Sequence, residues 1–218
     1  MNDKLLDVGS SVVINAEILA DLISALTVVG YQVIGPQLKD GAIVYEPLES
    51  TDELPRGWQD RQEGGSYRLE RSDRSALFDY VVGPHSLKRY LFPPRQRLWR
   101  AQRGEKGFEI ESQSNHEIPR YAFLAVRSCE LNALQIQDRV FIQDDFSDPA
   151  YRQRRNASFI VAVNCARPAQ TCFCTSMNTG PKAEAGFDLA LTEIIDTQHH
   201  EFVVSIGSAQ GAEIAAQL

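Results

Sequence analysis

The sequence predicts an α/β fold in which a small N-terminal α/β element and hairpins precede a βαβ unit with a mixed sheet and a cysteine loop at the sheet's carboxyl edge. Two apolar runs, 121–126 and 158–163, have the near-continuous hydrophobicity of strands that are buried on both faces. Helix signals lie between these runs, and three of the four cysteines follow the second run. Strand, helices and strand in this order predict parallel strands joined by a right-handed crossover.

Length and composition indicate one large or two small domains, because 218 residues that are 43% hydrophobic can bury a core. We expect a small α/β element in 1–48, a linker or loop in 49–65, the main α/β domain with the four cysteines in 66–206, and a terminal helix in 207–218. The chain has no run of 18 apolar residues and no secretory signal, which predicts a cytoplasmic protein without a membrane span. A net charge of −7 argues against nucleic-acid binding.

The N-terminal element begins with an amphipathic helix over 15–29, for which Asn15 is the expected N-cap. Short strands are expected at 31–35 and 42–45. The segment 49–65 is rich in Gly, Pro, Ser and Asp, which is typical of a loop, and Trp58 within it is expected to be a packing anchor. The runs 66–70 and 77–82 have the character of strands.

A basic segment interrupts this acidic chain, because no acidic residue occurs between Tyr80 and Gly104. Two interpretations remain open: a solvated face whose cations pair with acids elsewhere, or a docking surface for an acidic redox partner or an anion. The candidate docking residues are Lys88, Arg89, Arg95, Arg97 and Arg100. A hairpin is expected around 104–107, with strands at 95–101 and 108–111.

The second half of the chain supplies the βαβ unit and a final hairpin. Ser128 is the expected N-cap of a helix that ends near Asp138, and Asp148 with Pro149 begins a second helix. Alternation predicts strands at 187–191 and 201–206, and the histidines between them are expected to be loop residues rather than metal ligands.

The four cysteines have the spacing C-x35-C-x6-C-x-C, and they are Cys129, Cys165, Cys172 and Cys174. Four thiols match the ligand count of a tetrahedral zinc site or of an iron–sulfur cluster, although the spacing fits neither a zinc ribbon nor a bacterial ferredoxin. Buried cysteines that act as small hydrophobic residues are the structural alternative. In an extended Cys-Phe-Cys triplet, both sulfurs would face the same side.

The βαβ unit makes a geometric prediction about these thiols. Cys129 and Cys165 each follow the end of one of its strands, so parallel strands would place both at the same carboxyl edge of the sheet. Cys129 would also lie at a helix N-terminus, which favours a thiolate. The loop with Cys172 and Cys174 would then fold back over them.

Several motifs together resemble the iron–sulfur electron-transfer subunits typified by the beta subunit of sulfhydrogenase-type nickel–iron hydrogenases, and the iron–sulfur subunit of anaerobic sulfite reductase is similar. They are KRYLFPPR (88–95), VRSCEL (126–131), DPAYRQRRN (148–156), NC (164–165), TCFCTSM (171–177) and GFDLALT (186–192). The resemblance covers roughly residues 80–206 well and the first 75 loosely. The family motif prefers Pro where this chain has Ser128, and Asp where it has Glu130.

The resemblance implies that the four cysteines ligate an additional [4Fe–4S] cluster and that the chain transfers electrons without being catalytic itself. Its expected partners are other subunits of a redox complex and a ferredoxin-like domain, into which the terminal helix would lead and which supplies the family's other clusters. Arg127 and Arg167 flank ligands, where they would either raise the potential or form structural pairs. A protein-binding module stabilised by zinc on the same four thiols and a thiol-dependent enzyme remain the alternatives.

Overall fold

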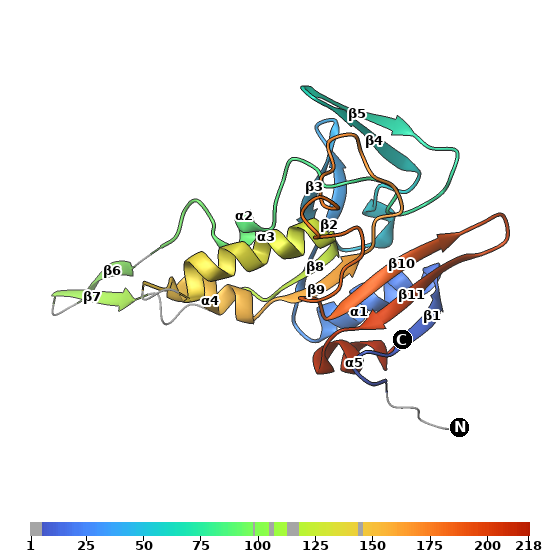
Figure 1. Ribbon diagram of the computed structural model, residues 1–218. Helices are drawn as coiled ribbons and strands as arrows, with labels where there is room; N and C mark the ends of the chain where they lie inside the picture. Colours follow the sequence, from blue (N-terminus) through green and yellow to red (C-terminus); the bar gives the residue numbers. More distant parts are fainter. Residues whose placement is uncertain (1–5, 98, 105–106, 113–117, 144–145) are drawn as a thin grey trace.

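A mixed seven-stranded sheet forms the centre of the computed structural model, which describes residues 6–97, 99–104, 107–112, 118–143 and 146–218 (Figure 1). In spatial order its strands are β1 (Ser11–Asn15), β11 (His200–Ile206), β10 (Leu189–Ile195), β9 (Phe159–Val163), β8 (Tyr121–Val126), β2 (Gln32–Lys39) and β3 (Ala42–Pro47). Neighbouring strands from β2 to β10 pair in parallel, whereas β3, β11 and β1 are antiparallel to their neighbours. The predicted α/β class and mixed sheet are therefore confirmed.

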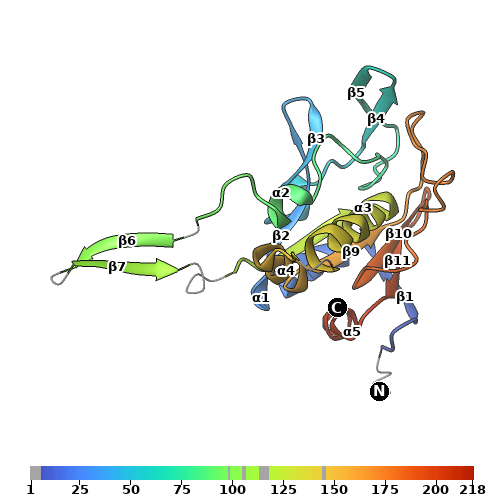
Figure 2. The same cartoon turned by 60° about the vertical axis from the view of Figure 1, so that its left-hand side comes forward.

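Helices cover both faces of the sheet and give the fold three layers (Figure 2). On one face, α1 (Leu19–Val28) and α5 (Ala209–Ala215) pack on a core that contains Phe159, Val161 and Val163. On the other face, α2 (Lys88–Leu91), α3 (Ser128–Asp138) and α4 (Pro149–Asn156) pack on a second core that contains Ile160 and Ala162. Successive residues of β9 enter opposite cores because side chains alternate along a strand. Within the described part of the chain, no helix combines the length and apolarity needed to cross a membrane.

The predicted βαβ unit is present as β8, α3, a π-helical turn (Arg139–Gln143), α4 and β9. Its strands pair in parallel from Ala122 opposite Phe159 to Val126 opposite Ala162. A bulge interrupts this register at Ala125, whose φ of 68° lies in the left-handed region. The extra residue changes the direction in which the chain leaves β8, just before α3 begins.

The helix starts at the carboxyl edge of the sheet differ in one detail from the prediction. The N-cap of α3 is Arg127, not Ser128, and the Glu130 carboxylate accepts from the Arg127 backbone N–H at 3.0 Å. The Ser128 hydroxyl instead donates to the Lys182 carbonyl at 2.9 Å. The predicted caps of the other helices are confirmed, since Asn15 caps the 3-10 turn Ala16–Ile18 that leads into α1 and Asp148 caps α4.

The N-terminal residues do not form a sheet of their own, because β1, β2 and β3 belong to the sheet that contains β8 to β11. The expected linker at 49–65 contains a 3-10 turn (Thr51–Glu53) and strand β4 (Trp58–Glu63), which pairs with β5 (Ser66–Arg71). Trp58 stacks under the Arg71 guanidinium, 4.2 Å from the ring centroid. A second hairpin, β6 (Trp99–Gly104) and β7 (Gly107–Ser112), confirms the expected turn at 104–107.

The prediction of a strand at 77–82 is wrong. Residues 76–81 are all buried, but their backbone follows an irregular course. The N–H groups of Leu77 and Phe78 donate to Glu193 at 2.7 and 3.0 Å, and the N–H of Val81 donates to Asp60 at 2.7 Å. Side chains thus satisfy the polar groups that a neighbouring strand would otherwise satisfy. We call 76–81 the buried segment below.

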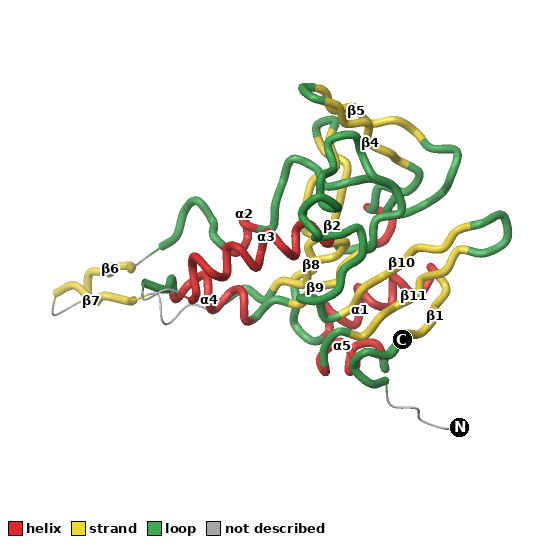
Figure 3. Tube along the Cα trace, viewed as in Figure 1, coloured by secondary structure: helices red, strands yellow, loops and turns green. Residues whose placement is uncertain are grey.

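Strands β9 and β10 form a parallel pair whose connection contains no helix or strand (Figure 3). This connection, residues 164–188, is the cysteine loop. It is anchored at its base, where the Asn164 side-chain oxygen accepts from the Ala183 N–H at 2.8 Å and the Asn164 amide donates to Thr192 at 2.8 Å. The expected β10–β11 hairpin follows, and its His200 ring lies 2.7 Å from a Glu193 oxygen.

Candidate metal centre

The four cysteines are contributed by two places on the carboxyl edge of the parallel strands. Cys129 lies in the first turn of α3, directly after β8, and Cys165 follows β9 by two residues. Because β8 and β9 are parallel neighbours, these two thiols leave the sheet at the same edge, as expected. Cys172 and Cys174 lie further along the cysteine loop.

Electrostatic interactions show that the thiols share one neighbourhood. Burial raises the pKa of Cys165, and repulsion from Cys174 and Cys172 adds to the rise, while Arg127 opposes it. Burial raises the pKa of the Cys129 thiol to about 12, with further contributions from Glu130, Cys165 and Cys174. Cys165 is therefore the thiol that interacts with all three others.

The expectation that the α3 N-terminus favours a Cys129 thiolate is not met. Although part of the Cys129 side chain reaches solvent, the protein around its sulfur disfavours the charged form more than the helix start favours it. The adjacent Glu130 carboxylate adds like charge. All four cysteines are free thiols.

The sulfurs share a neighbourhood without forming a closed coordination shell. Among the residues that the structure describes, no three His, Cys, Asp or Glu side chains are gathered closely enough to hold a metal ion. The donor chemistry nevertheless fits a thiolate-ligated group, because the four candidates are all sulfur donors and a backbone N–H already points at one of them. The Ala169 N–H donates to the Cys172 sulfur at 3.3 Å.

Arg127 is the largest charged group at this site, and it is 1% exposed. Its guanidinium donates to the carbonyls of Phe78 and Tyr80 at 2.8 and 2.7 Å, and it lies 4.0 Å from the Cys165 sulfur. Among described residues no carboxylate lies within 4.0 Å of it, and its Nε has no hydrogen-bond partner. A buried cation without a paired anion leaves positive potential at the thiols.

Glu130 continues this buried network on the other side of the α3 N-terminus. It accepts from the Tyr45 hydroxyl at 2.8 Å and from the Arg127 N–H, while its second oxygen has no partner within the described chain. Burial raises the pKa of Glu130 to about 7, and the hydrogen bonds from Arg127 and Tyr45 oppose that rise. The sequence offered no signal for Tyr45, which lies 80 residues before the Ala125 carbonyl that its hydroxyl also contacts.

Arg167 has a different role from Arg127, because it is paired. It lies 3.4 Å from Asp60 and 3.6 Å from Asp79, two carboxylates that are almost fully buried. It also donates to the Asp60 carbonyl at 2.8 Å. Arg167 therefore ties the cysteine loop to β4 and to the buried segment, as a structural pair rather than as a free charge.

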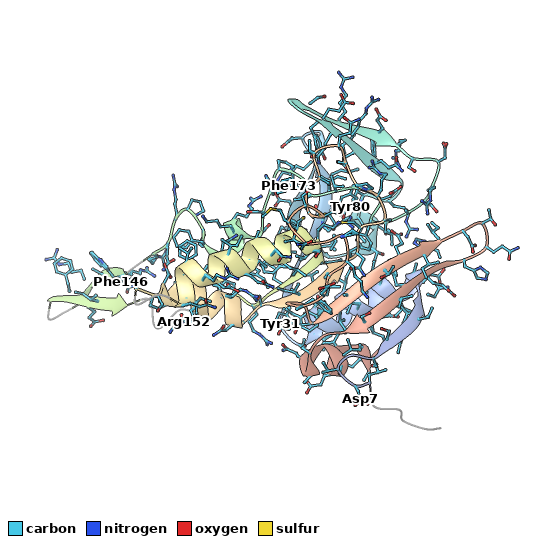
Figure 4. All side chains as sticks on the ribbon, in the orientation of Figure 1. Asp7, Tyr31, Tyr80, Phe146, Arg152 and Phe173 are labelled. Atoms are coloured by element: carbon cyan, nitrogen blue, oxygen red, sulfur yellow. The ribbon has the colours of Figure 1, made fainter. Side chains whose placement is uncertain are left out.

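The buried segment is held to the site by both arginines. Arg127 binds its carbonyls at Phe78 and Tyr80, and Arg167 donates to the Asp79 carbonyl at 3.3 Å. Figure 4 places Tyr80 and Phe173 of the cysteine loop at the same end of the molecule. Local sequence patterns gave no indication of Asp60, Asp79 and Glu193, since their roles depend on partners more than 80 residues away.

The candidate docking residues lie apart from the thiols. Lys88 and Arg89 are on α2, and Arg89 forms an ion pair with Glu46 at 3.6 Å. Arg95, Arg97 and Arg100 are exposed and have no ion pair with a carboxylate of the described residues. The segment is thus exposed, and only Arg89 is paired in the manner of the solvated-face alternative.

Comparison with known proteins yields one match of note. Sulfhydrogenase 2 subunit beta of Pyrococcus furiosus is 27% identical over 200 residues, which cover 92% of this chain and 49% of the relative. The chain therefore spans about half the length of the relative that it matches. No protein-family model and no solved structure matches it. The chain is a homologue of a hydrogenase beta subunit, which is the family that its motifs indicate.

Proposed function

We propose that this chain holds a [4Fe–4S] cluster through Cys129, Cys165, Cys172 and Cys174 and serves as an electron-transfer subunit of a hydrogenase- or sulfite-reductase-like redox complex. The observation that carries the proposal is the buried, unpaired guanidinium of Arg127 beside the Cys165 sulfur. Four thiolates around a cluster bring net negative charge, which this cation complements. The similarity to a sulfhydrogenase beta subunit supports the same function.

Each residue of the site has a definable task. When bound, the cluster would supply one-electron transfer. The four cysteines would hold it, the Ala169 N–H would donate to the sulfur of Cys172, and Arg127 would offset negative charge. Arg167 would keep the cysteine loop attached to the buried segment, which excludes water from one side.

The raised pKa values of Cys129 and Cys165 disfavour the thiol-enzyme alternative, because a nucleophilic cysteine needs a lowered pKa. Zinc remains a competitor, since it uses the same donors. The experiment is anaerobic purification of the chain with quantitation of iron, sulfide and zinc, and an EPR spectrum after reduction. Iron and sulfide in equal amounts with a cluster signal support the proposal. Stoichiometric zinc in a colourless protein overturns it.

We further propose that Lys88, Arg89, Arg95, Arg97 and Arg100 face other subunits of the complex or a ferredoxin-like domain. Exposed cations without paired acids would speed association with an acidic partner, and salt would screen that effect. Charge reversal at Arg95 and Arg97 is expected to slow complex assembly at low ionic strength. Unchanged assembly rates at low salt would assign these residues to a solvated face.

A further inference from the structure

The β6–β7 hairpin projects from the body of the molecule at the end opposite the sheet's antiparallel strands β1 and β11 (Figures 1 and 2). Its strands pair from Trp99 opposite Ser112 to Gly104 opposite Gly107. An isolated two-stranded hairpin is marginally stable in water and needs a further surface on which to pack.

The register separates the hairpin into two chemically different faces. Directly paired residues share a face, so Trp99, Ala101, Phe108 and Ile110 lie on one side, together with Arg103. The side chains of Trp99, Phe108 and Ile110 are 62%, 76% and 71% exposed. Arg100, Gln102 and Glu109 lie on the other side. One face of the hairpin is thus apolar and exposed to water, which is the pattern of a surface that another protein covers.

The charges around this face indicate what kind of surface covers it. Arg95, Arg97, Arg100 and Arg103 are exposed on β6 and on the segment leading to it, and none of them forms an ion pair with a carboxylate in the described ranges. Two apposed copies of the hairpin would bring these arginines together, and like charges oppose such a contact. A partner with acidic side chains around an apolar groove would match both features.

We infer that the apolar face of the β6–β7 hairpin inserts into an apolar groove of a partner subunit whose rim is acidic. Trp99, Phe108 and Ile110 are the anchors, and the four arginines lie around them. This inference deepens the proposed function, because the partner is a protein of the redox complex. Large apolar side chains at the centre of an interface carry most of its binding energy, whereas rim charges mainly set the association rate.

Site-specific photocrosslinking in the native host tests the inference. A photoreactive phenylalanine analogue replaces Ile110 in the full chain, and mass spectrometry identifies the crosslinked protein and peptide. The control has the analogue at Val28, which is 84% exposed on α1. We expect an adduct from position 110, and none from position 28, with a redox subunit through a segment that contains acidic residues. An adduct with a second copy of this chain, or none at all, overturns the inference.

Variants of the two features separate anchoring from steering once that subunit is purified. Phe108→Asp is expected to weaken its binding by about tenfold or more through faster dissociation, at every salt concentration. Arg95→Glu is expected to slow association at low salt alone. Equal affinity of Phe108→Asp and the unaltered chain would overturn the inference. Iron and sulfide content, measured on the same samples, reports the cluster proposal independently of the docking.

Discussion

The guanidinium of Arg127 lies 4.0 Å from the sulfur of Cys165 and binds the carbonyls of the buried segment with its other end. One side chain therefore joins an electrostatic task at the thiols to a structural task at residues far away in the sequence. These two tasks can be separated by substitution.

Arg127→Gln is expected to lower the reduction potential of the bound cluster, because removal of a nearby positive charge makes the added electron less favourable. It also leaves the carbonyls of Phe78 and Tyr80 without their donors, at a cost of about 1–3 kcal/mol for each buried group. A redox titration followed by EPR measures the first effect, and denaturant unfolding measures the second. Arg127→Lys keeps the charge, so a potential that falls equally in both variants would contradict the electrostatic role.

Glu193→Gln is expected to destabilise the fold, because this carboxylate accepts from the N–H groups of Leu77 and Phe78 and contacts His200. Its side chain is 5% exposed, so the loss of an acceptor is expected to cost about 1–3 kcal/mol. Chemical denaturation measures the free energy of unfolding. Glu201→Gln in the neighbouring strand is the matched control, and a similar loss there would show that the carboxylate of Glu193 has no special role.

Gly180→Ala tests how closely the cysteine loop packs near Cys174. A Cβ at this position would lie 3.2 Å from the Cys174 sulfur and 3.5 Å from the Ser128 Cβ, so the loop must shift. We expect faster loss of iron to a chelator, followed by absorbance. Gly64→Ala in the β4–β5 turn is the control, because its Cβ would meet nothing within 4 Å. Equal rates in both variants would show that the loop absorbs the extra carbon freely.

Cys172→Ser is expected to abolish or convert the cluster and to increase proteolysis of the cysteine loop, while circular dichroism stays nearly unchanged. Metal binding to thiolates is coupled to local order, whereas the βαβ unit has its own apolar core. The hydrogen bonds of Asn164 anchor only the base of the loop. If limited proteolysis cuts the variant and the loaded protein at the same rate, packing alone orders the loop.

Local patterns in the sequence were sufficient for the elements that position Cys129 and Cys165. The apolar runs of β8 and β9 and the proline-bearing start of α4 are signals within a few residues, and they predicted the parallel pair correctly. The seven-stranded sheet was not predictable in this way, because β2 pairs with β8 across a long separation. The helix-free connection from β9 to β10 also departs from the usual crossover of parallel strands.

The buried segment shows why a strand signature can mislead. Its apolar side chains fill the core as those of a strand would. Its backbone groups, however, bind side chains of Glu193, Asp60, Arg127 and Arg167. Hydrogen bonds from side chains that are distant in sequence leave no periodic trace, so local patterns give the burial and miss the backbone conformation.

Helix α3 begins at the thiols and ends toward the β6–β7 hairpin (Figure 1). Its 11 residues span about 16 Å, so grip and conduction are located at opposite ends of one rigid rod. A protein that clasps the hairpin leaves the sulfur end of the rod open to a different visitor. Evolution can therefore exchange the clasp, and with it the choice of complex, without retuning the redox centre.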